Sequence, residues 1–444
     1  MTKSEINHIN SCDVVLEDTT EVMRQYLRIK REHPDSILMY RLGDFYETFF
    51  EDAELMSREL QLTLTGRDAG KVLGRIPLAG IPYRAADTYI EKLVQRGFKI
   101  AICEQLEDPK QSKGLVERGV VRVITPGTIV ESEYLNQSSN NYLCAVFKDG
   151  DNWGFAYTDI STGEFKASKL PLDSVLTELA RINPSEVIAP AKKLKLEPFQ
   201  IVPEEVIDLP DEISKIYTCT KVPSRIFEPD FAQNNLKAIL KLKDLDALGY
   251  KNYEMQYRAS AGLLAYIWEN MKEGFPKFEK INIYELSEFI SLDVNTRKNL
   301  ELTETIRDKN KYGSLLWAID KTTTSMGARL LKNWICQPLK DKEKIINRQN
   351  IVKKLFEDSD TRYEIENILR DIYDIQRLSS RMSNGTATPR DYLSLKITLN
   401  VFPKLIEASN KIGISLFKSL ETRLNDITNF SSLIDKTLVD TPPI

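Results

Sequence analysis

Few side chains in this sequence have the types and spacing of a catalytic or metal-binding group. Histidine occurs only at His8 and His33, so a serine- or cysteine-based triad would have to take its base from the N-terminal segment. The five cysteines lie far apart, and no pair has the spacing of a zinc ligand set. They are Cys12, Cys103, Cys144, Cys219 and Cys336. We expect free thiols in a reducing compartment and no metal site.

No glycine-rich stretch of the sequence meets the requirements of a phosphate-binding loop. A P-loop needs four residues between two glycines, then lysine and a hydroxyl residue that binds magnesium. The stretch Gly66–Val72 has one residue too few between its glycines and ends in valine. Gly114 and Gly119 have the right separation, but Val120 follows them. We therefore predict that these 444 residues do not themselves bind ATP.

The segment from Tyr40 to Phe50 concentrates aromatic side chains around one carboxylate. The aromatic residues are Tyr40, Phe45, Tyr46, Phe49 and Phe50, and the carboxylate is Glu47. One interpretation is an aromatic core cluster, with Glu47 as an acid at the start of a helix. Phe45 and Glu47 are also two residues apart, and an extended segment would turn both to the same side. Spacing alone leaves a structural role and a binding role open.

The bulk composition is that of an ordinary folded protein. The chain is 42% hydrophobic and 28% charged, and its net charge of −4 gives no global sign of a nucleic-acid binder, although one domain could still carry a basic face. The N-terminus lacks the apolar core of a signal peptide, and no run approaches 18 apolar residues. We expect a soluble, cytoplasmic protein. At roughly 100–200 residues per domain, the length predicts two to four domains.

Residues 1–130 are predicted to form a mixed α/β domain that holds the aromatic segment. Thr19 or Thr20 can cap a helix that Pro34 stops. The expected helices after it are Glu51–Leu60 and Ala85–Arg96, with Gly97 as the C-cap of the second. The expected strands are Ile37–Tyr40, Phe98–Cys103 and Val120–Ile124.

The rest of the chain divides into a linker, a second α/β domain and a helical region. Residues 131–141 include the polar run Asn136–Asn141, which is typical of a linker. Residues 142–280 begin with three expected strands joined by turns at Asp149-Gly150 and Thr162-Gly163, and a helix follows around Val175–Ile182. The strands are Tyr142–Phe147, Trp153–Asp159 and Glu164–Lys169. Residues 281–444 are predicted to form a helical core region, with a helical pattern throughout from about residue 285.

An ordered series of motifs from about residue 20 to the end resembles the MutS family. Arg41–Phe49 resembles the mismatch-binding signature of that family, whose core is Phe-x-Glu. The later blocks are Ile76–Tyr83, Val116–Arg118 with Arg122 and Thr125–Thr128, Asp159–Gly163, Asn295–Glu301, Met326–Leu331, Trp334–Leu339 and Asp440–Pro443. One block alone would be weak, but the ordered set is specific. The family usually has histidine after the tyrosine of the second block, where this chain has Arg84.

The resemblance implies a mismatch-binding domain, an RNase-H-like connector and a partial helical core. In the family the phenylalanine of the signature stacks on a mispaired base and the glutamate hydrogen-bonds it, which gives these roles to Phe45 and Glu47. Arg67, Arg75 and Arg84, together with Lys71, are candidates for phosphate contacts, with solvated surface charge as the alternative. Further candidates for DNA contact or support are Asp44, Leu78, Gly80 and Tyr83. The implied function is recognition of mispaired or unpaired bases at the start of DNA mismatch repair.

The resemblance also implies what lies outside these residues. The family's ATPase and its ATP and magnesium site are expected beyond Ile444, so the whole protein would be a weak DNA-dependent ATPase and this chain none. The expected partners are mismatched or looped double-stranded DNA, a second copy in a homodimer and a MutL-type repair protein, at the nucleoid. One alternative is a MutS-like protein for junctions or recombination, which would lack the Phe-x-Glu pair. The other is an RNase-H-like nuclease using Asp159, Glu164 and Asp173 on paired metal ions.

Overall fold

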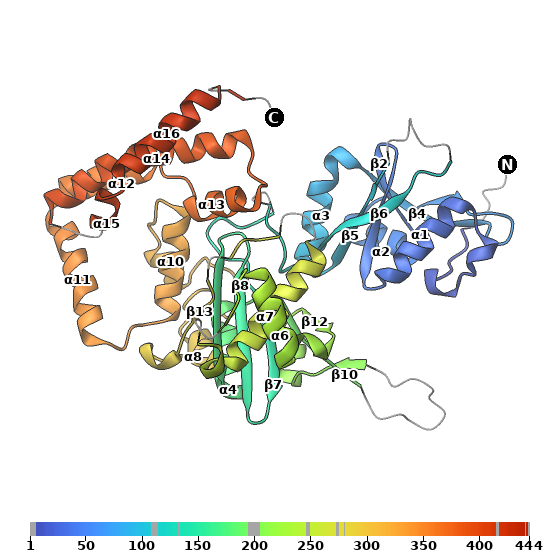
Figure 1. The fold of residues 1–444 in the computed structure, drawn as a ribbon, viewed down its shortest axis with the longest axis horizontal. Coiled ribbons are helices and arrows are strands. Elements are labelled where there is room, and N and C mark those ends of the chain that lie inside the picture. Colours follow the sequence, from blue (N-terminus) through green and yellow to red (C-terminus); the bar gives the residue numbers. More distant parts are fainter. Residues whose placement is uncertain are drawn as a thin grey trace. The chain divides into compact units, whose positions relative to one another are not determined.

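A computed structural model describes residues 6–107, 114–131, 134–193, 205–245, 249–271, 275–278, 280–413, 417–439 and 441–442 (Figure 1). The chain divides into two units, which are described separately. The first holds Met1–Ile129 and Leu264–Phe275, and the second holds Val130–Leu263 and Pro276–Ile444. Two mixed sheets with helices precede a helical C-terminal region, which confirms the predicted fold class.

The first unit is built on a six-stranded sheet with the strand order β3-β4-β2-β1-β5-β6. β1 and β5 are parallel, and the other neighbouring strands are antiparallel. The strands are β1 (Ser36–Leu42), β2 (Phe45–Phe49), β3 (Thr65–Asp68), β4 (Arg75–Pro82), β5 (Lys99–Gln105) and β6 (Arg118–Ile124). The helices are α1 (Glu21–Glu32), α2 (Phe50–Leu60) and α3 (Ala86–Gln95).

The helix boundaries of the first unit follow the capping signals of the sequence. The Thr20 hydroxyl accepts a hydrogen bond from the Met23 amide at 3.5 Å, so α1 begins where the cap predicted. Gly97, just after α3, has a φ of +89°, the left-handed conformation that favours glycine at a helix end. Tyr26 of α1 packs edge-to-face on Phe49 with 4.9 Å between ring centroids, and this contact anchors the helix to the sheet.

The second unit begins with a seven-stranded sheet in the order β11-β10-β7-β8-β9-β13, with β12 paired to β10. The strands are β7 (Leu143–Asp149), β8 (Asn152–Asp159), β9 (Glu164–Leu170), β10 (Glu186–Lys193), β11 (Glu205–Ile207), β12 (Cys219–Val222) and β13 (Asn282–Ile283). Helix α4 (Leu172–Ile182) buries Val175 and Leu179 in the core of this sheet. Gly150 and Gly163 have positive φ angles, which confirms both predicted turns.

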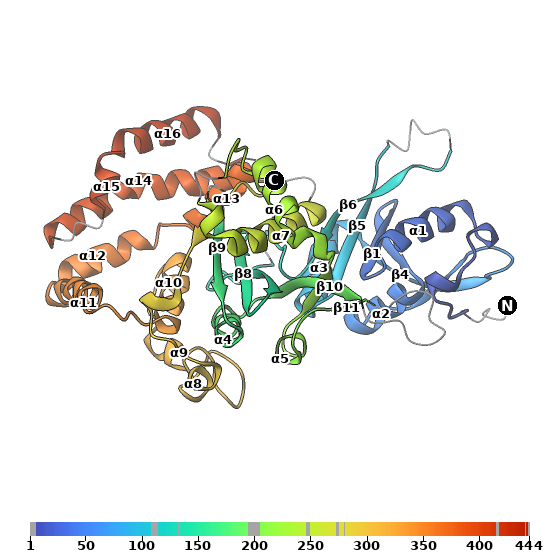
Figure 2. The same ribbon diagram turned by 60° about the horizontal axis from the view of Figure 1, so that its bottom comes forward.

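Helices follow the sheet of the second unit. They are α5 (Asp211–Ser214), α6 (Pro229–Ile239), α7 (Glu254–Asn270), α8 (Val294–Asn299), α9 (Leu315–Ile319), α10 (Ser325–Cys336), α11 (Lys342–Glu357), α12 (Ser359–Leu369), α13 (Ile375–Asn384), α14 (Pro389–Lys411), α15 (Lys418–Glu421) and α16 (Leu424–Thr437). The division between the units falls within α7, at Leu263. Helix α14 packs on both α12 and α16, and Figure 2 shows the three side by side.

The prediction of a helical pattern throughout from about residue 285 is wrong for its first part. Turns occupy most of residues 300–314, where Glu301, Lys309 and Gly313 have positive φ angles that a right-handed helix cannot contain. Between Asn299 and Ser325 the only helix in this described stretch is the five-residue α9. Apolar residues alone therefore overstated the helix content. In the described part of the chain, no helix is long and apolar enough to cross a membrane.

Candidate nucleic-acid interface

The Phe-x-Glu pair lies at the tip of a tight hairpin in the first unit. Strands β1 and β2 are joined by the two residues Gly43 and Asp44, and Leu42 pairs directly with Phe45. Gly43 has a φ of +59°, and a two-residue hairpin turn favours glycine at this first central position. The Asp44 carbonyl accepts a hydrogen bond from the Tyr83 amide at 2.9 Å. The turn therefore places Phe45 at the first position of β2 and ties the tip to the end of β4.

Phe45 differs from the aromatic residues around it in exposure. Tyr40, Phe49 and Phe50 are fully buried and Tyr46 nearly so, whereas Phe45 is 46% exposed. The aromatic-core interpretation is therefore correct for four of the five side chains and wrong for Phe45. Side chains alternate along a strand, so Phe45, Glu47 and Phe49 share one face of β2. The core covers the Phe49 end of that face and leaves the Phe45 end open.

Glu47 lies in the middle of β2, so its interpretation as an acid at a helix start is wrong. Its side chain is 22% exposed, and its Oε2 accepts a hydrogen bond from Nη1 of Arg67 at 2.7 Å. Glu47 pairs across the sheet with Gly80 of β4. A β-carbon at Gly80 would lie 3.6 Å from Cγ of Glu47 and 3.9 Å from the Phe45 ring. Gly80 therefore lies directly beside the side chains of Phe45 and Glu47.

Arg41 is a residue of this site that sequence reasoning missed as a candidate. Its guanidinium lies 3.6 Å from the centre of the Tyr83 ring, a cation–π contact, and its Nε donates to the Gly43 carbonyl at 2.5 Å. Arg41 also lies 3.7 Å from the Glu104 carboxylate, which accepts a hydrogen bond from the Tyr46 hydroxyl. Its position just before the turn glycine was the available signal. Through these contacts Arg41 stabilises the hairpin tip.

The remaining candidates lie on β4 and just after it. Leu78 is half-buried against the core, and the Arg75 side chain covers the backbone of Gly66. Tyr83 is half-buried, and Arg84 is exposed and donates from Nε to the Tyr83 hydroxyl at 3.4 Å. This hydrogen bond and the charge of Arg84 lower the pKa of Tyr83. Arg84, like exposed Lys71, has the accessibility that a phosphate contact needs.

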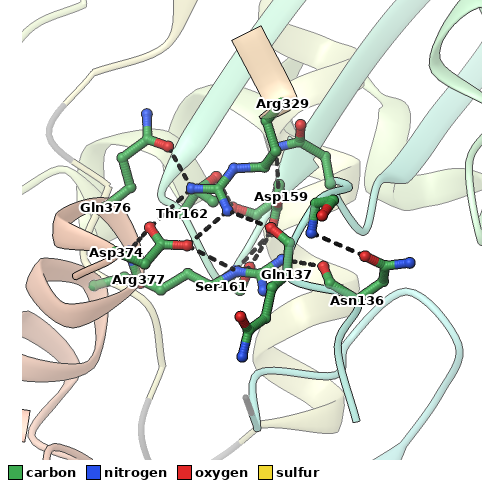
Figure 3. Close-up of polar contacts among 12 residues, drawn as sticks. Asn136, Gln137, Asp159, Ser161, Thr162, Arg329, Asp374, Gln376 and Arg377 are labelled. Atoms are coloured by element: carbon green, nitrogen blue, oxygen red, sulfur yellow. Dashed lines mark hydrogen bonds and ion pairs between the residues drawn. The ribbon is translucent and has the colours of Figure 1, made fainter. Parts of the chain in front are cut away.

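A second polar site, in the second unit, joins the β8–β9 turn to the helical region (Figure 3). We call it the arginine cluster and define it as Arg329, Arg377, Asp374 and Asp159. Arg329 of α10 makes a bidentate ion pair with Asp374, at 2.6 and 2.8 Å, and donates to the Gln137 carbonyl at 3.0 Å. Both arginines are buried. This pair holds the N-terminus of α13 and the segment before β7 against α10.

Arg377 of α13 links the arginine cluster to the turn between β8 and β9. It donates to the Ser161 hydroxyl at 3.2 Å and to the carbonyls of Asn136 and Ser139 at 3.1 and 2.9 Å. Asp159 accepts from the Ser161 amide and hydroxyl at 3.0 and 2.6 Å. Within the described residues, Nε of Arg329 and Nη1 of Arg377 are buried without a hydrogen-bond partner. Arg377 thus ties the polar run after residue 135 to α13 at two carbonyls, and Arg329 ties it to α10 at a third.

The pKa values of the two carboxyl groups in the arginine cluster are shifted in opposite directions. Burial raises the pKa of Asp159, against the hydrogen bonds from Ser161 and Asn140 and the charge of Arg377. Burial also opposes ionisation of Asp374, but the hydrogen bonds and charges of Arg329 and Arg377 outweigh it and lower the pKa of Asp374. Asp374 is therefore the carboxylate whose ionised form stabilises the fold.

We expect the stabilisation from Asp374 to disappear in acid. A depressed folded-state pKa stabilises the protein above the unfolded value, about 3.9 for aspartate, and the contribution is lost as the pH falls through the folded pKa. The unfolding free energies of the native chain and Asp374→Asn should therefore differ most near neutral pH and converge as the pH falls below the unfolded value and through the lower folded pKa. Urea titrations of both proteins across this pH range measure the difference. Asp159 is present in both proteins, so its contribution cancels in the comparison. A difference independent of pH would contradict the assignment.

The carboxylates considered for a nuclease do not form a metal site. Asp159 is buried in the arginine cluster, Glu164 accepts from the Tyr142 hydroxyl at 3.0 Å, and Asp173 is exposed on α4. Among the described residues, no group of three or more histidine, cysteine or acidic side chains is arranged to hold a metal ion. The geometry gives no support to the nuclease alternative.

Three family models match the chain in order. They are MutS domain I over residues 20–133, MutS domain II over residues 141–279 and MutS domain III over residues 295–444. The DNA mismatch repair protein MutS of Synechococcus elongatus is 40% identical over 452 residues, covering 100% of this chain and 51% of its own length. Those of Alkaliphilus metalliredigens and Clostridium novyi are also 40% identical, covering 97% and 96% of the chain and 48% and 45% of their own lengths.

The fold and the site define a multidomain protein in which an α/β unit with an exposed aromatic hairpin tip precedes a second α/β sheet and a helical region. The matches agree with this architecture in order and in extent. The chain belongs to the MutS family of DNA mismatch repair proteins, of which it holds the regions of domains I to III. It spans about half the length of the curated relatives that it matches.

Proposed function

We propose that this chain recognises mispaired or unpaired bases in duplex DNA, the first step of mismatch repair. The observation that carries the proposal is the 46% exposure of Phe45 at the tip of a braced hairpin, beside a carboxylate on the same face. Phe45 is the ring of this aromatic segment that a base could reach, because the other four rings are buried in the core. The relatives named as mismatch repair proteins support the same assignment.

The physical basis is the low stability of a mismatched step. A mispaired base stacks poorly, so opening that step requires less free energy than the few kcal/mol needed at a matched one. Stacking of a base on an aromatic ring returns about 1–3 kcal/mol. The balance is near zero at a mismatch and unfavourable elsewhere. Phe45 would therefore discriminate by the deformability of the duplex and not by a base code.

Glu47 and the surrounding cations complete the proposed reading element. A carboxylate near DNA is repelled by the phosphates, so Glu47 must gain a hydrogen bond from the displaced base in return. Arg84, Arg75 and Lys71 would supply phosphate contacts that position the protein without reading sequence. Asp44, Leu78, Gly80 and Tyr83 would support the tip. Arg41 would also support the tip, through its contacts with the Tyr83 ring and the Gly43 carbonyl.

We also propose the division of labour along the chain. Residues 1–130 would form the mismatch-binding domain, 131–141 a linker, 142–280 the connector and 281–444 part of the helical core. Hydrolysis of ATP with magnesium would belong to a part of the protein outside these residues. A homodimer in the cytoplasm that recruits a MutL-type protein is the expected setting.

The proposal is tested by comparing two duplexes that differ at one position. Fluorescence anisotropy with a single-mismatch or unpaired-T duplex and its homoduplex, at two salt concentrations, gives an affinity ratio. The measurement uses the chain and, if the reading frame continues beyond Ile444, the longer protein. We expect tighter binding to the mismatched duplex at both salts, while absolute affinities fall with salt. Equal affinities for both duplexes in both proteins would refute the proposal.

Replacing the carboxylate of Glu47 should raise the affinity for homoduplex without raising the affinity for the mismatched duplex. Glu47→Ala removes a repulsion toward phosphates, so the affinity for homoduplex should rise about two- to tenfold, a change of roughly 0.5–1.4 kcal/mol. It also removes the hydrogen bond to the base, so the mismatched duplex should gain nothing or bind more weakly. The same anisotropy assay measures both. An unchanged homoduplex affinity would show that the carboxylate does not face the DNA.

A further inference from the structure

We propose that Arg67 is a positioning residue that acts on mismatch discrimination through Glu47 and not through a phosphate contact of its own. This inference rests on the proposed function. The alternative, that Arg67 is one of several cations that bind the DNA backbone, follows from its charge and its place near the second motif. The geometry of the side chain separates the two.

The Arg67 side chain is directed along the sheet toward Glu47. Arg67 lies on β3, and β4 separates that strand from β2. Its guanidinium reaches back across β4, 5.6 Å from the centre of the Phe49 ring, and Nη1 meets the Glu47 carboxylate at 2.7 Å. Gly80, the β4 residue paired with Glu47, has no side chain, and a β-carbon there would lie against Cγ of Glu47 and the Phe45 ring. Arg67 is 34% exposed, less than a residue extended into solvent.

The other basic residues of this region have different surroundings. Arg41 lies on the Tyr83 ring, Arg84 contacts the Tyr83 hydroxyl, and the Arg75 side chain covers Gly66. Lys71 is exposed in the loop between β3 and β4. Arg67 is therefore the basic residue that the structure places against the carboxylate of the reading pair.

The ion pair would have two effects on recognition. It neutralises Glu47 locally, which reduces the repulsion between this carboxylate and an approaching polyanion. It also fixes the direction of the carboxylate, so one oxygen stays bound while the other can accept a hydrogen bond from a base. Without Arg67, Glu47 would keep its charge and lose its orientation. The mismatched duplex would then lose more affinity than the homoduplex.

A double-mutant cycle on duplex affinity tests the inference. The proteins are the native chain, Arg67→Ala, Glu47→Ala and the double variant, each measured on mismatched and matched duplexes at two salts. We expect Arg67→Ala to lower the mismatch-to-homoduplex ratio about two- to fivefold, the size expected for loss of a partly exposed ion pair. In the Glu47→Ala background the same substitution should leave the ratio unchanged, because its target is gone.

Two further variants separate positioning from a general loss of charge. Arg67→Lys keeps a cation that can reach the carboxylate and should restore most of the ratio. Lys71→Ala is the matched control, since it removes a nearby exposed cation and should weaken both duplexes alike. Circular dichroism checks that each variant folds, and Arg67→Gln replaces Arg67→Ala if that variant does not.

The outcomes distinguish failure of the inference from failure of the function. A native chain that binds both duplexes equally overturns the proposed function itself. A native chain that prefers mismatches, with an Arg67→Ala effect of the same size in both backgrounds, overturns the inference. A salt dependence that falls by about one charge with equal losses on both duplexes would make Arg67 a phosphate ligand instead.

Discussion

Asp374→Ala is expected to lower the free energy of unfolding of the second unit by about 3–5 kcal/mol. The substitution leaves the buried guanidinium of Arg329 without its carboxylate partner and removes one of the two carboxylates near Arg377, the other being Asp159. Breaking a buried ion pair from one side is far more destabilising than removing an exposed one, because the remaining charge stays out of water. Urea unfolding followed by circular dichroism measures the change.

The helical region offers a matched control for this variant. Asp358 caps α12 as Asp374 caps α13, and each accepts a hydrogen bond from the amide three residues on. Asp358 accepts hydrogen bonds from the amide and hydroxyl of Thr361, and not from a buried arginine. Asp358→Ala should therefore show only the loss of a cap, a much smaller destabilisation than that of Asp374→Ala. Equal effects of the two variants would mean that the arginine cluster contributes nothing beyond capping.

Phe45→Ala should abolish the preference for mismatched over matched duplex while leaving weak, salt-sensitive binding in place. Phosphate contacts supply affinity that falls with salt and ignores sequence. In the proposed function Phe45 would supply the stacking contribution of about 1–3 kcal/mol, so its loss should weaken mismatch binding roughly tenfold to a hundredfold and homoduplex binding little. The measurement is duplex anisotropy at two salt concentrations.

Two companions sharpen the Phe45 experiment. Phe45→Leu keeps an apolar side chain but has no aromatic face, so it should lose discrimination as the alanine variant does. Val15→Ala shortens another exposed apolar side chain of the first unit and should leave the ratio intact. If Phe45→Ala retains the native ratio at both salts, the stacking role is wrong, and the exposure of the ring needs another explanation.

Local signals predicted the elements where one residue decides the geometry. Thr20 caps α1, and Gly97, Gly150 and Gly163 adopt the positive φ angles that their turns require. Strands β3 and β4 were not predicted as strands, because glycine and charged residues dominate the first and prolines interrupt the second. Their pairing with β2 depends on partners far away in the sequence. Because this pairing is not local, the sequence could not show that Gly80 lies beside Glu47.

The candidate site was predictable in its residues but not in its contacts. Spacing showed that Phe45 and Glu47 could share a face, yet it could not tell which of five neighbouring aromatic residues the core would leave uncovered. That depends on where the packing of α1 ends along β2, which is a tertiary property. The pairing of Arg67 with Glu47 spans two strands and twenty residues. Arg377 likewise carried no local signal, since its partners lie more than 200 residues earlier.

The two-residue turn at Gly43 has a consequence for the entropy of binding. A reading residue on a long loop would have to lose backbone freedom when it enters the duplex, about 1–2 kcal/mol for each residue ordered. Phe45 is instead paired with Leu42 across the hairpin, and its backbone is already ordered in the free protein. A phenylalanine side chain adds only two rotatable bonds to be fixed. Phe45 is thus preorganised for its proposed role, and most of its modest stacking energy would remain available to distinguish one duplex from another.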